Sequence, residues 1–353
     1  MNVFKRFNFV GGRVLKTGIA VFLTALICDW LDWPPMFAVI TAIVTVEPTA
    51  ADSIKKAFVR FPASAIGAAF SVVFNFAFGP SPLTYMLVAV ATIIACHRLR
   101  LHDGALVAVL TGVAMISTVQ DNYFASFLVR LGTTGIGLTV STLVNLLVIR
   151  PDYSRPIQEK IGQAVRDTGN MLEKRILEII QNQPLHQTTK MDFRQLLKKL
   201  ESIETLCTYQ KDEWKLHRSD RKDMRSLHYE YKKLAILRQI HYHLGNLLSL
   251  PSLELDREKQ HVISEMGKSM KTTLFDADFT IDDGHAALVS ELVALLKKEV
   301  EDREPQSQRF SEEAVIFYEL LSIHDLLEEL EHIHKLEAKH QRLLDQPFSE
   351  GSY

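Results

Sequence analysis

The sequence predicts an all-α protein: a six-span membrane helix bundle in residues 1–150, built as a 3+3 inverted repeat, followed by a cytosolic helical bundle in residues 151–353. Three observations support this prediction. The first half is apolar and poor in charge, whereas the second half carries most of the Lys, Arg, Asp and Glu. Basic and non-basic turns alternate between the apolar runs. Two blocks of the apolar half also match each other at one offset.

Six apolar runs have the breaks expected of membrane helices, which need about 20 apolar residues to cross a hydrocarbon core of ~30 Å. They cover approximately residues 13–31, 35–47, 58–78, 82–96, 104–119 and 123–149. The second, fourth and fifth are short for a full crossing. The first run follows basic residues but lacks a small-x-small cleavage site, so we interpret it as a span rather than a signal peptide.

Lysine and arginine gather in alternate turns. Besides the basic N-terminal segment, the turns after spans two, four and six carry Lys55, Lys56, Arg60, Arg98, Arg100, Arg150, Arg155 and Lys160. The three intervening turns, residues 29–35, 79–82 and 120–122, contain none. Because basic loops remain in the cytoplasm, the pattern predicts six spans with both termini cytoplasmic.

An internal repeat links spans three and six. At an offset of seventy positions, residues 60–75 match residues 130–145, with identical residues at Arg60/Arg130, Ile66/Ile136, Gly67/Gly137, Ser71/Ser141 and Asn75/Asn145. Residues 38–41 match residues 108–111 at the same offset. Shared membrane composition is the alternative explanation. Three spans per repeat is an odd number, so the second repeat enters from the opposite side, a plan common in transporters.

The second half shows apolar residues at helical spacing and no convincing strand. Helices are expected over residues 157–181, 191–216, 225–248, 258–274, 285–300 and 310–344, with breaks at residues 250–252, 273–284 and 303–308. These helices predict a cytoplasmic bundle, with coiled-coil or dimeric association as an open option.

Three segments of the membrane half resemble the bacterial aromatic acid exporter family, within the fusaric-acid-resistance-type exporters. They are Lys16–Ala20, Phe37–Thr49, and Arg60 followed by Gly67. The Phe37–Thr49 segment is also similar to the plant aluminium-activated malate transporters. The resemblance implies a bacterial cytoplasmic-membrane exporter or anion-conducting protein for organic acids, assembled as a homodimer or larger oligomer.

Arg130 is the sharpest candidate for a substrate residue, since a charge about two and a half helical turns after Asp121 is costly within a membrane. Such residues face an aqueous path or a partner, and a guanidinium pairs well with carboxylates. The structural alternative is a snorkelling arginine, or one paired with Asp121 or Asp29.

Glu47 precedes Pro48 at the end of span two, where it would accept protons in a coupled exporter or act as a cap paired with Lys55, Lys56 or Arg60. Arg60 is either a substrate ligand or a positive-inside anchor. Five further polar residues are expected within the membrane, lining the path or hydrogen-bonding neighbouring helices: Thr41, Thr45, Thr111, Asn75 and Asn145.

Cofactor and catalytic signals are weak. His324, His332, His334 and His340 lie on one predicted helix, but their spacing suits chelation poorly, so we expect no metal. The three cysteines are far apart and the chain has no phosphate-binding loop. We therefore expect no cofactor, no catalytic residues and no enzyme activity. The expected partners are membrane lipid, small organic anions and further copies of the chain, and no nucleic acid.

The sequence thus predicts an exporter of small organic acids, with either proton exchange or channel-like conductance. The alternative is a membrane-anchored sensor or scaffold whose cytosolic helical domain binds a ligand or a protein.

Overall fold

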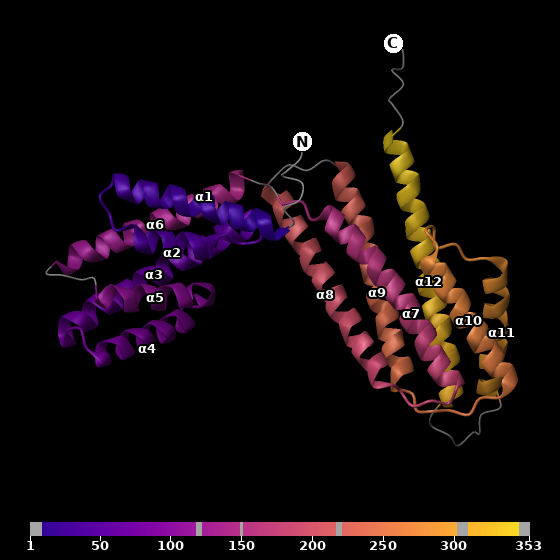
Figure 1. The fold of residues 1–353 in the computed structure, drawn as a ribbon. Coiled ribbons are helices and arrows are strands. Elements are labelled where there is room, and N and C mark those ends of the chain that lie inside the picture. The colour runs from indigo at the N-terminus through magenta and orange to yellow at the C-terminus, as the bar shows by residue number, and fades with distance from the viewer. Residues whose placement is uncertain (1–8, 118–121, 149–150, 217–220, 302–309, 346–353) are drawn as a thin grey trace, which may run out of the picture. The chain divides into compact units, whose positions relative to one another are not determined.

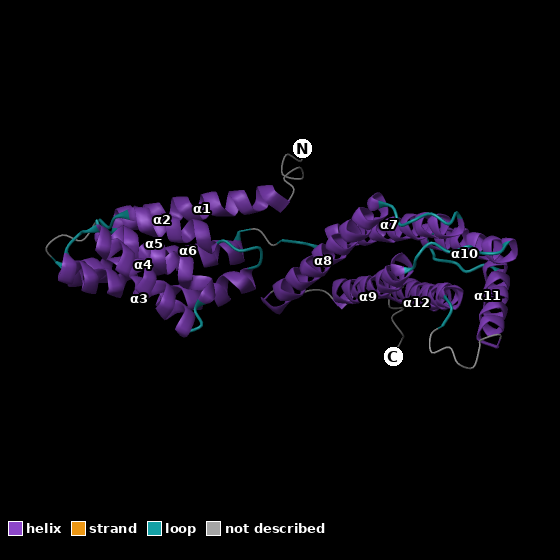
Figure 2. Ribbon diagram, turned by 90° about the horizontal axis from the view of Figure 1, so that it is seen from below, coloured by secondary structure: helices purple, strands orange, loops and turns teal. Residues whose placement is uncertain are grey.

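The computed structural model describes residues 9–117, 122–148, 151–216, 221–301 and 310–345. Within these residues every regular element is a helix, as predicted (Figure 1, Figure 2). The chain divides into two compact units. One consists of Met1–Asp152 and Tyr209–Arg218, and the other of Tyr153–Thr208 and Ser219–Tyr353.

The first unit contains the apolar helices. They are α1 (Phe9–Trp30), α2 (Pro35–Thr45), α3 (Ala50–Phe78), α4 (Pro82–Arg98), α5 (Ala105–Ile116) and α6 (Tyr123–Leu147), with a 3-10 turn, η2 (His102–Gly104), before α5. Three are long and apolar enough to cross a membrane, over Gly11–Trp30, Ala50–Phe78 and Tyr123–Leu147. Helices α2, α4 and α5 are apolar but shorter, in agreement with the sequence pattern.

Helix α3 begins earlier than its apolar pattern indicates. The pattern predicts a span from about residue 58, but the helix starts at Ala50. Thr49 caps it, since its side chain accepts a hydrogen bond from the Asp52 backbone N–H at 3.0 Å. Such a cap satisfies one of the N–H groups left free at a helix start. The charged first turns of α3 therefore extend the helix beyond its apolar run.

The six helices form two three-helix bodies. Helices α1, α2 and α6 pack against one another, and so do α3, α4 and α5. The two bodies meet mainly where α3 packs against α6. Each body therefore combines two helices from one half of the unit with the last helix of the other half.

Two glycines allow the backbones within each body to touch. A Cβ atom on Gly67 of α3 would lie 2.1 Å from the carbonyl oxygen of Ala108 on α5, and one on Gly137 of α6 would lie 2.4 Å from the carbonyl oxygen of Ala38 on α2. No other residue fits at these distances without moving a backbone. Both glycines and both alanines are related by the offset of seventy positions.

The six helices predicted for the polar half are present, each within a few residues of its expected bounds, and they make up the second unit except for residues 209–216. They are α7 (Ser154–Ile180), α8 (Gln187–Leu216), α9 (Arg221–Ser249), α10 (Arg257–Phe275), α11 (Asp283–Glu301) and α12 (Glu312–Asp345). Helix α7 packs against α9 and α10, and α12 packs against α9, α10 and α11. Their apolar faces form the core of a helical bundle.

A fully buried arginine fixes the end of α9 in this bundle. Arg175 of α7 donates from Nε to the Leu247 carbonyl (3.0 Å) and from Nη2 to the Leu250 carbonyl (3.1 Å). Its Nη1 atom pairs with Glu178 Oε2 at 3.2 Å. Because the carbonyls at a helix end lack partners within the helix, this guanidinium stabilises the turn that follows α9.

Candidate substrate site

Arg130 lies about two turns into α6 and is 6% exposed. Its Nη2 atom donates to Thr111 Oγ1 on α5 at 2.9 Å. Its Cζ atom lies 3.5 Å from the centroid of the Phe37 ring on α2, which is cation–π contact. The side chain thus begins on one three-helix body and hydrogen-bonds to the other.

No acidic residue neutralises this guanidinium in the part of the chain that the structure describes. Its Nε and Nη1 atoms are buried and lack any hydrogen-bond partner there. Asp29 does not pair with it, and Asp121 lies outside the described residues. Burying an unpaired charge costs free energy. An anion that reached Arg130 would offset that cost.

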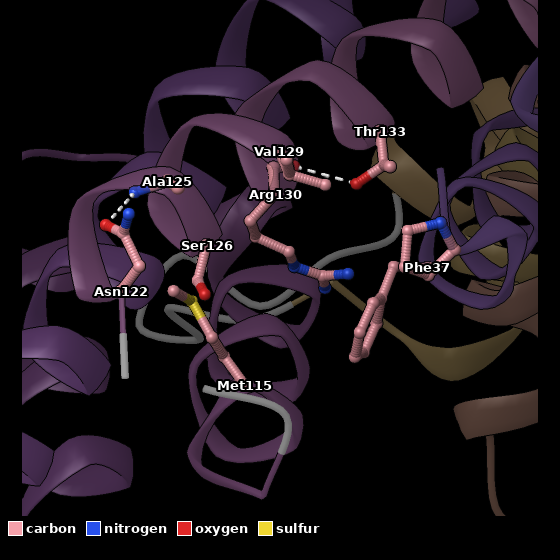
Figure 3. Close-up of a pocket in the computed structure, with 9 residues that line it drawn as sticks. Phe37, Met115, Asn122, Ala125, Ser126, Val129, Arg130 and Thr133 are labelled. Atoms are coloured by element: carbon pink, nitrogen blue, oxygen red, sulfur yellow. Dashed lines mark hydrogen bonds between the residues drawn. The ribbon is translucent and has the colours of Figure 1, made fainter. Parts of the chain in front are cut away.

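A cavity of about 320 Å³ opens beside Arg130 (Figure 3). Its walls come from the start of α2, the end of α5 and the first turns of α6. In Figure 3 the guanidinium lies between the side chains of Phe37 and Met115. Ser126 and Thr133 add hydroxyl groups to a lining that is otherwise mainly apolar. Apolar walls around one cation suit a small organic anion.

Arg60 occupies the equivalent position in the first repeat, yet it is fully engaged. Its Nη2 atom pairs with Glu47 Oε1 at 2.6 Å and its Nη1 atom donates to the Val44 carbonyl at 3.0 Å. Lys56 Nζ adds a second ion pair to Glu47 at 3.0 Å. Arg60 is 7% exposed and connects α3 to the end of α2.

Glu47 lies in the connection between α2 and α3. Burial raises the pKa of its carboxyl, but the hydrogen bonds and charges of Lys56 and Arg60 outweigh burial, so the pKa lies below its ordinary value. A carboxylate held in this way stays ionised at neutral pH. The geometry therefore favours the cap interpretation of Glu47 over the proton-acceptor interpretation.

Asn145, near the end of α6, lies at the centre of a second polar cluster. Its Oδ1 atom accepts a hydrogen bond from Lys16 Nζ at 2.8 Å. Its Nδ2 atom donates to Ser53 Oγ (2.7 Å), to the Thr49 carbonyl (3.0 Å) and to the Glu47 carbonyl (3.1 Å). This cluster and the Arg60–Glu47 pair join α1, α6 and the α2–α3 connection. Arg130 lies fifteen residues earlier on α6, or about 22 Å along a helix.

Asn75 is the counterpart of Asn145 in the first repeat, but it has fewer partners. Its Nδ2 atom donates to the Ile116 carbonyl at 3.4 Å, and its Oδ1 atom has no partner among the described residues. The position equivalent to Lys16 is Met86, which cannot donate. Asn75 therefore lies in a separate contact and does not line the Arg130 cavity.

The three candidate threonines differ in role. Thr41 and Thr45 donate within their own helix, to the Phe37 carbonyl (2.8 Å) and the Thr41 carbonyl (2.7 Å). Thr111 instead connects Arg130 to Ser64, whose hydroxyl lies 3.1 Å from Thr111 Oγ1. Only Thr111 of the three is therefore brought to the candidate site.

The seam between the two bodies carries a chain of hydroxyl groups. Ser64 Oγ on α3 lies 3.3 Å from Thr134 Oγ1 on α6, and both are fully buried. These residues are seventy positions apart, so each repeat contributes the same position to the contact. Through Ser64 and Thr111 this contact continues to Arg130. The site is thus connected to the centre of the unit.

Several residues of the site were not identified from the sequence. The sequence pattern does not indicate Met115, Ser126 or Thr133 as site residues, and it places Phe37 only in the family-like segment Phe37–Thr49. The spacing of Ser126, Arg130 and Thr133 on one face of α6 was an available signal. Lys16 belongs to the basic N-terminal flank and to the family-like segment Lys16–Ala20, yet it also lies inside the first predicted span, which is the same signal that indicates Arg130.

The C-terminal histidines do not gather at one point. His324 Nδ1 lies 3.0 Å from His285 Nε2, and His334 Nε2 lies 3.3 Å from Asp278 Oδ1. His324 and its neighbours Asp325 and Glu328 bring ligand atoms within 4.8 Å of one another. Both carboxylates are exposed, and this trio lacks the four closed ligands of a structural zinc site.

Comparison with known proteins gives matches over two different lengths. A family model described as Aromatic acid exporter family member 1 matches residues 8–148. Nearly the whole chain is similar to proteins called UPF0421 protein. One from Bacillus cereus is 42% identical over 340 residues, covering 94% of this chain and 97% of the relative. One from Oceanobacillus iheyensis is 40% identical, covering 91% and 95%. One from Staphylococcus aureus is 34% identical, covering 91% and 97%.

Proposed function

The chain belongs to the UPF0421 proteins and, over residues 8–148, to the aromatic acid exporter family, and from this membership we propose that it exports small organic acids across the bacterial cytoplasmic membrane. Aromatic acids are the first candidates among these substrates. The observation that carries the proposal is Arg130, a buried guanidinium without a counter-ion among the described residues, beside a cavity with mainly apolar walls.

The proposed binding mode follows from the lining of the cavity. The carboxylate of the substrate accepts a charge-assisted hydrogen bond from the guanidinium of Arg130, whose Nε and Nη1 atoms have no partner among the described residues. The apolar body of the substrate rests against Met115 and the ring of Phe37. An aromatic body gains further contact, because aromatic side chains pack well edge to face.

We propose a layout of six spans in two inverted repeats of three, with both termini in the cytoplasm. Support comes from the exchange of α3 and α6 between the two bodies, and from the matched Gly67–Ala108 and Gly137–Ala38 contacts. The alternation of basic and non-basic turns supports the orientation. In this layout the Arg130 cavity lies toward the outer side, and the Glu47–Arg60 and Lys16–Asn145 contacts lie toward the cytoplasm.

In this layout the cytoplasmic and outer ends of the first unit differ in how accessible they are to a substrate. The cytoplasmic end is closed by ion pairs and hydrogen bonds, whereas the outer end contains a cavity. This is the arrangement of an outward-facing state in alternating access. Glu47 is a poor proton carrier in this state, because both of its basic partners favour its ionised form. A homodimer or larger assembly is part of the proposal.

Transport by reconstituted vesicles tests the role of Arg130. Efflux of radiolabelled benzoate should fall at least about tenfold for Arg130→Gln, since one charged hydrogen bond contributes about 1.5–3 kcal/mol. Arg98→Gln, an equal change at the exposed end of α4, is the matched control and should transport normally. Unchanged flux for Arg130→Gln would remove Arg130 from the pathway.

The second candidate function is a membrane-anchored sensor or scaffold whose cytosolic helices bind a ligand. A cavity with buried charges in the second unit favours it. Vesicles that contain the protein but show no organic-acid flux, with wild-type chain and Arg130→Gln alike, would favour the sensor. Flux that persists after deletion of residues 151–353 would favour the exporter.

A further inference from the structure

The second unit contains its own cavity, of about 330 Å³, between α7, α9, α12 and the segment that follows α10. Its apolar walls include Ile161 and Val165 of α7 and Phe279 of the connection after α10. Glu230 and Lys233 of α9 supply the charged part of the lining. The cavity belongs wholly to this unit and is unrelated to the Arg130 site.

The charges beside this cavity do not balance. Lys233 Nζ lies 3.2 Å from Glu230 Oε1 and 2.6 Å from Glu337 Oε2 of α12. The three residues are 8%, 6% and 6% exposed, respectively. Two buried carboxylates therefore share one ammonium, and the more weakly held one, Glu230, lines the cavity. Burial raises the pKa of the Glu230 carboxyl despite the opposing charge of Lys233.

No other basic side chain around the cavity forms an ion pair with Glu230 among the described residues. His334 of α12 lies 3.3 Å from the exposed Asp278 through its Nε2 atom and 4.0 Å from Glu337 Oε2 through its Nδ1 atom, so its direct acidic contacts are with these two residues. Arg166 of α7 and Asp276, at the end of α10, lie at the exposed rim. Neither rim residue forms a recorded ion pair with Glu230.

Two backbone features occur in the lining of the cavity. Gly162 lies in the third turn of α7 and lines the cavity, yet a Cβ atom there would meet nothing within 4 Å. Glycine inside a helix costs up to about 1 kcal/mol relative to alanine, so packing gives no reason for it. Phe279 is buried and has φ of 55°, a left-handed conformation that is unfavourable for a large side chain. Strain of this kind is concentrated at functional sites.

We propose that this cavity binds a small organic ammonium compound, with its charged nitrogen on Glu230 and its apolar body against Phe279, Ile161 and Val165. Such a ligand gives the two carboxylates a second cation and so balances the buried charge. The neighbouring aromatic ring adds cation–π attraction. An organic acid of the same shape would instead bring a third carboxylate to the cluster. The proposal does not depend on transport by the first unit.

Binding to the full-length protein in detergent micelles tests this inference. Isothermal titration with benzylammonium at neutral pH should show saturable binding to the wild-type chain. Gly162→Leu, which fills the cavity, and Glu230→Gln, which removes the excess charge, should each weaken that binding at least about tenfold. Glu291→Gln, an equal charge change on the exposed face of α11, is the control and should bind as the wild type does.

Two further measurements separate binding from folding and from the Arg130 site. Glu230→Gln leaves Lys233 and Glu337 as a one-to-one pair, so its thermal unfolding midpoint should not fall. Benzoate, which has nearly the same shape and the opposite charge, should bind equally to wild type, Gly162→Leu and Glu230→Gln. The proposal is overturned if folded wild type fails to bind benzylammonium, if both cavity variants bind it normally, or if they lose benzoate instead.

Discussion

Arg60 and Arg130 occupy equivalent positions in the two repeats, but their surroundings are opposite. Arg60 has an ion pair with Glu47 and a hydrogen bond to the Val44 carbonyl. Arg130 has one hydrogen bond to Thr111, the face of Phe37 and a cavity. The same residue type thus serves as a structural cross-link at one end and remains available at the other. Partners, more than burial, distinguish a structural charge from one that can bind a ligand.

The largest effect on transport is expected when Arg130 is given an acidic partner like the one that Arg60 has. Glu47 lies thirteen residues before Arg60, and the equivalent position before Arg130 is Ser117, at the exposed end of α5. Ser117→Glu should neutralise Arg130 and reduce benzoate efflux from vesicles at least about tenfold. Ser117→Gln has nearly the same size without the charge and should transport normally. Equal transport by both variants would show that the two ends are not equivalent.

Stability measurements should show the reverse order, because substitution of Arg60 should lower the free energy of unfolding and substitution of Arg130 should not. Arg60→Gln leaves Glu47 with Lys56 as its remaining basic partner, and we expect the free energy of unfolding to fall by about 3 kcal/mol. Arg130→Gln removes a charge that has no counter-ion, so stability should stay the same or rise. Thermal unfolding in detergent measures both. Equal losses for the two variants would contradict the view that Arg130 is a buried charge without a stabilising partner.

The pH range of these measurements is limited by His241 in the second unit. It is 6% exposed, stacks on Phe193 at 3.9 Å, and neither ring nitrogen has a hydrogen-bond partner among the described residues. Burial, with a smaller effect of Arg238, lowers the pKa of His241 to about 4.

Because its folded pKa is below the unfolded value of about 6.5, the unfolded chain binds more protons between these values. Stability is full above about pH 6.5 and is lost as the pH falls toward 4, by up to about 3 kcal/mol. His241→Phe keeps the stacked ring and should flatten this dependence in unfolding measurements across that range. His261→Gln, an exposed change on α10, is the control. Persistence of the dependence in His241→Phe would assign it to another group.

The smallest expected effect concerns the two glycine contacts, which occupy equivalent positions in the two repeats. Gly67→Ala and Gly137→Ala each force a methyl group against a carbonyl oxygen of a neighbouring helix. We expect each to lower the free energy of unfolding by about 1–3 kcal/mol, and by similar amounts, because the two contacts are counterparts. Gly12→Ala, with nothing within 4 Å, should cost nothing. A loss at only one of the two glycines would show that the repeats differ in their packing.

The sequence predicted the helical content, the apolar segments and the helices of the polar half, because helical periodicity and turn residues are local signals. It also indicated Arg130 as a candidate, since a charge inside an apolar run is visible without a structure, and its role in transport stays a prediction. It did not predict the early start of α3, which depends on the cap at Thr49. The pairing of Glu47 with Arg60 and Lys56 was one of the alternatives that the sequence offered. The ring beneath Arg130 escaped it, because that contact arises where helices distant in sequence meet. The cavity beside Glu230 escaped it for the same reason.

The glycine contacts bind α3 to α5 and α6 to α2, so that backbone touches backbone with no side chain between them. A pair of helices joined in this way has little freedom to slide. Any rearrangement that emptied the Arg130 cavity would therefore carry each of these two helix pairs as a block, with relative movement at the paired hydroxyls of Ser64 and Thr134. Each block draws helices from both halves of the membrane sequence, so neither half alone contains a complete moving part.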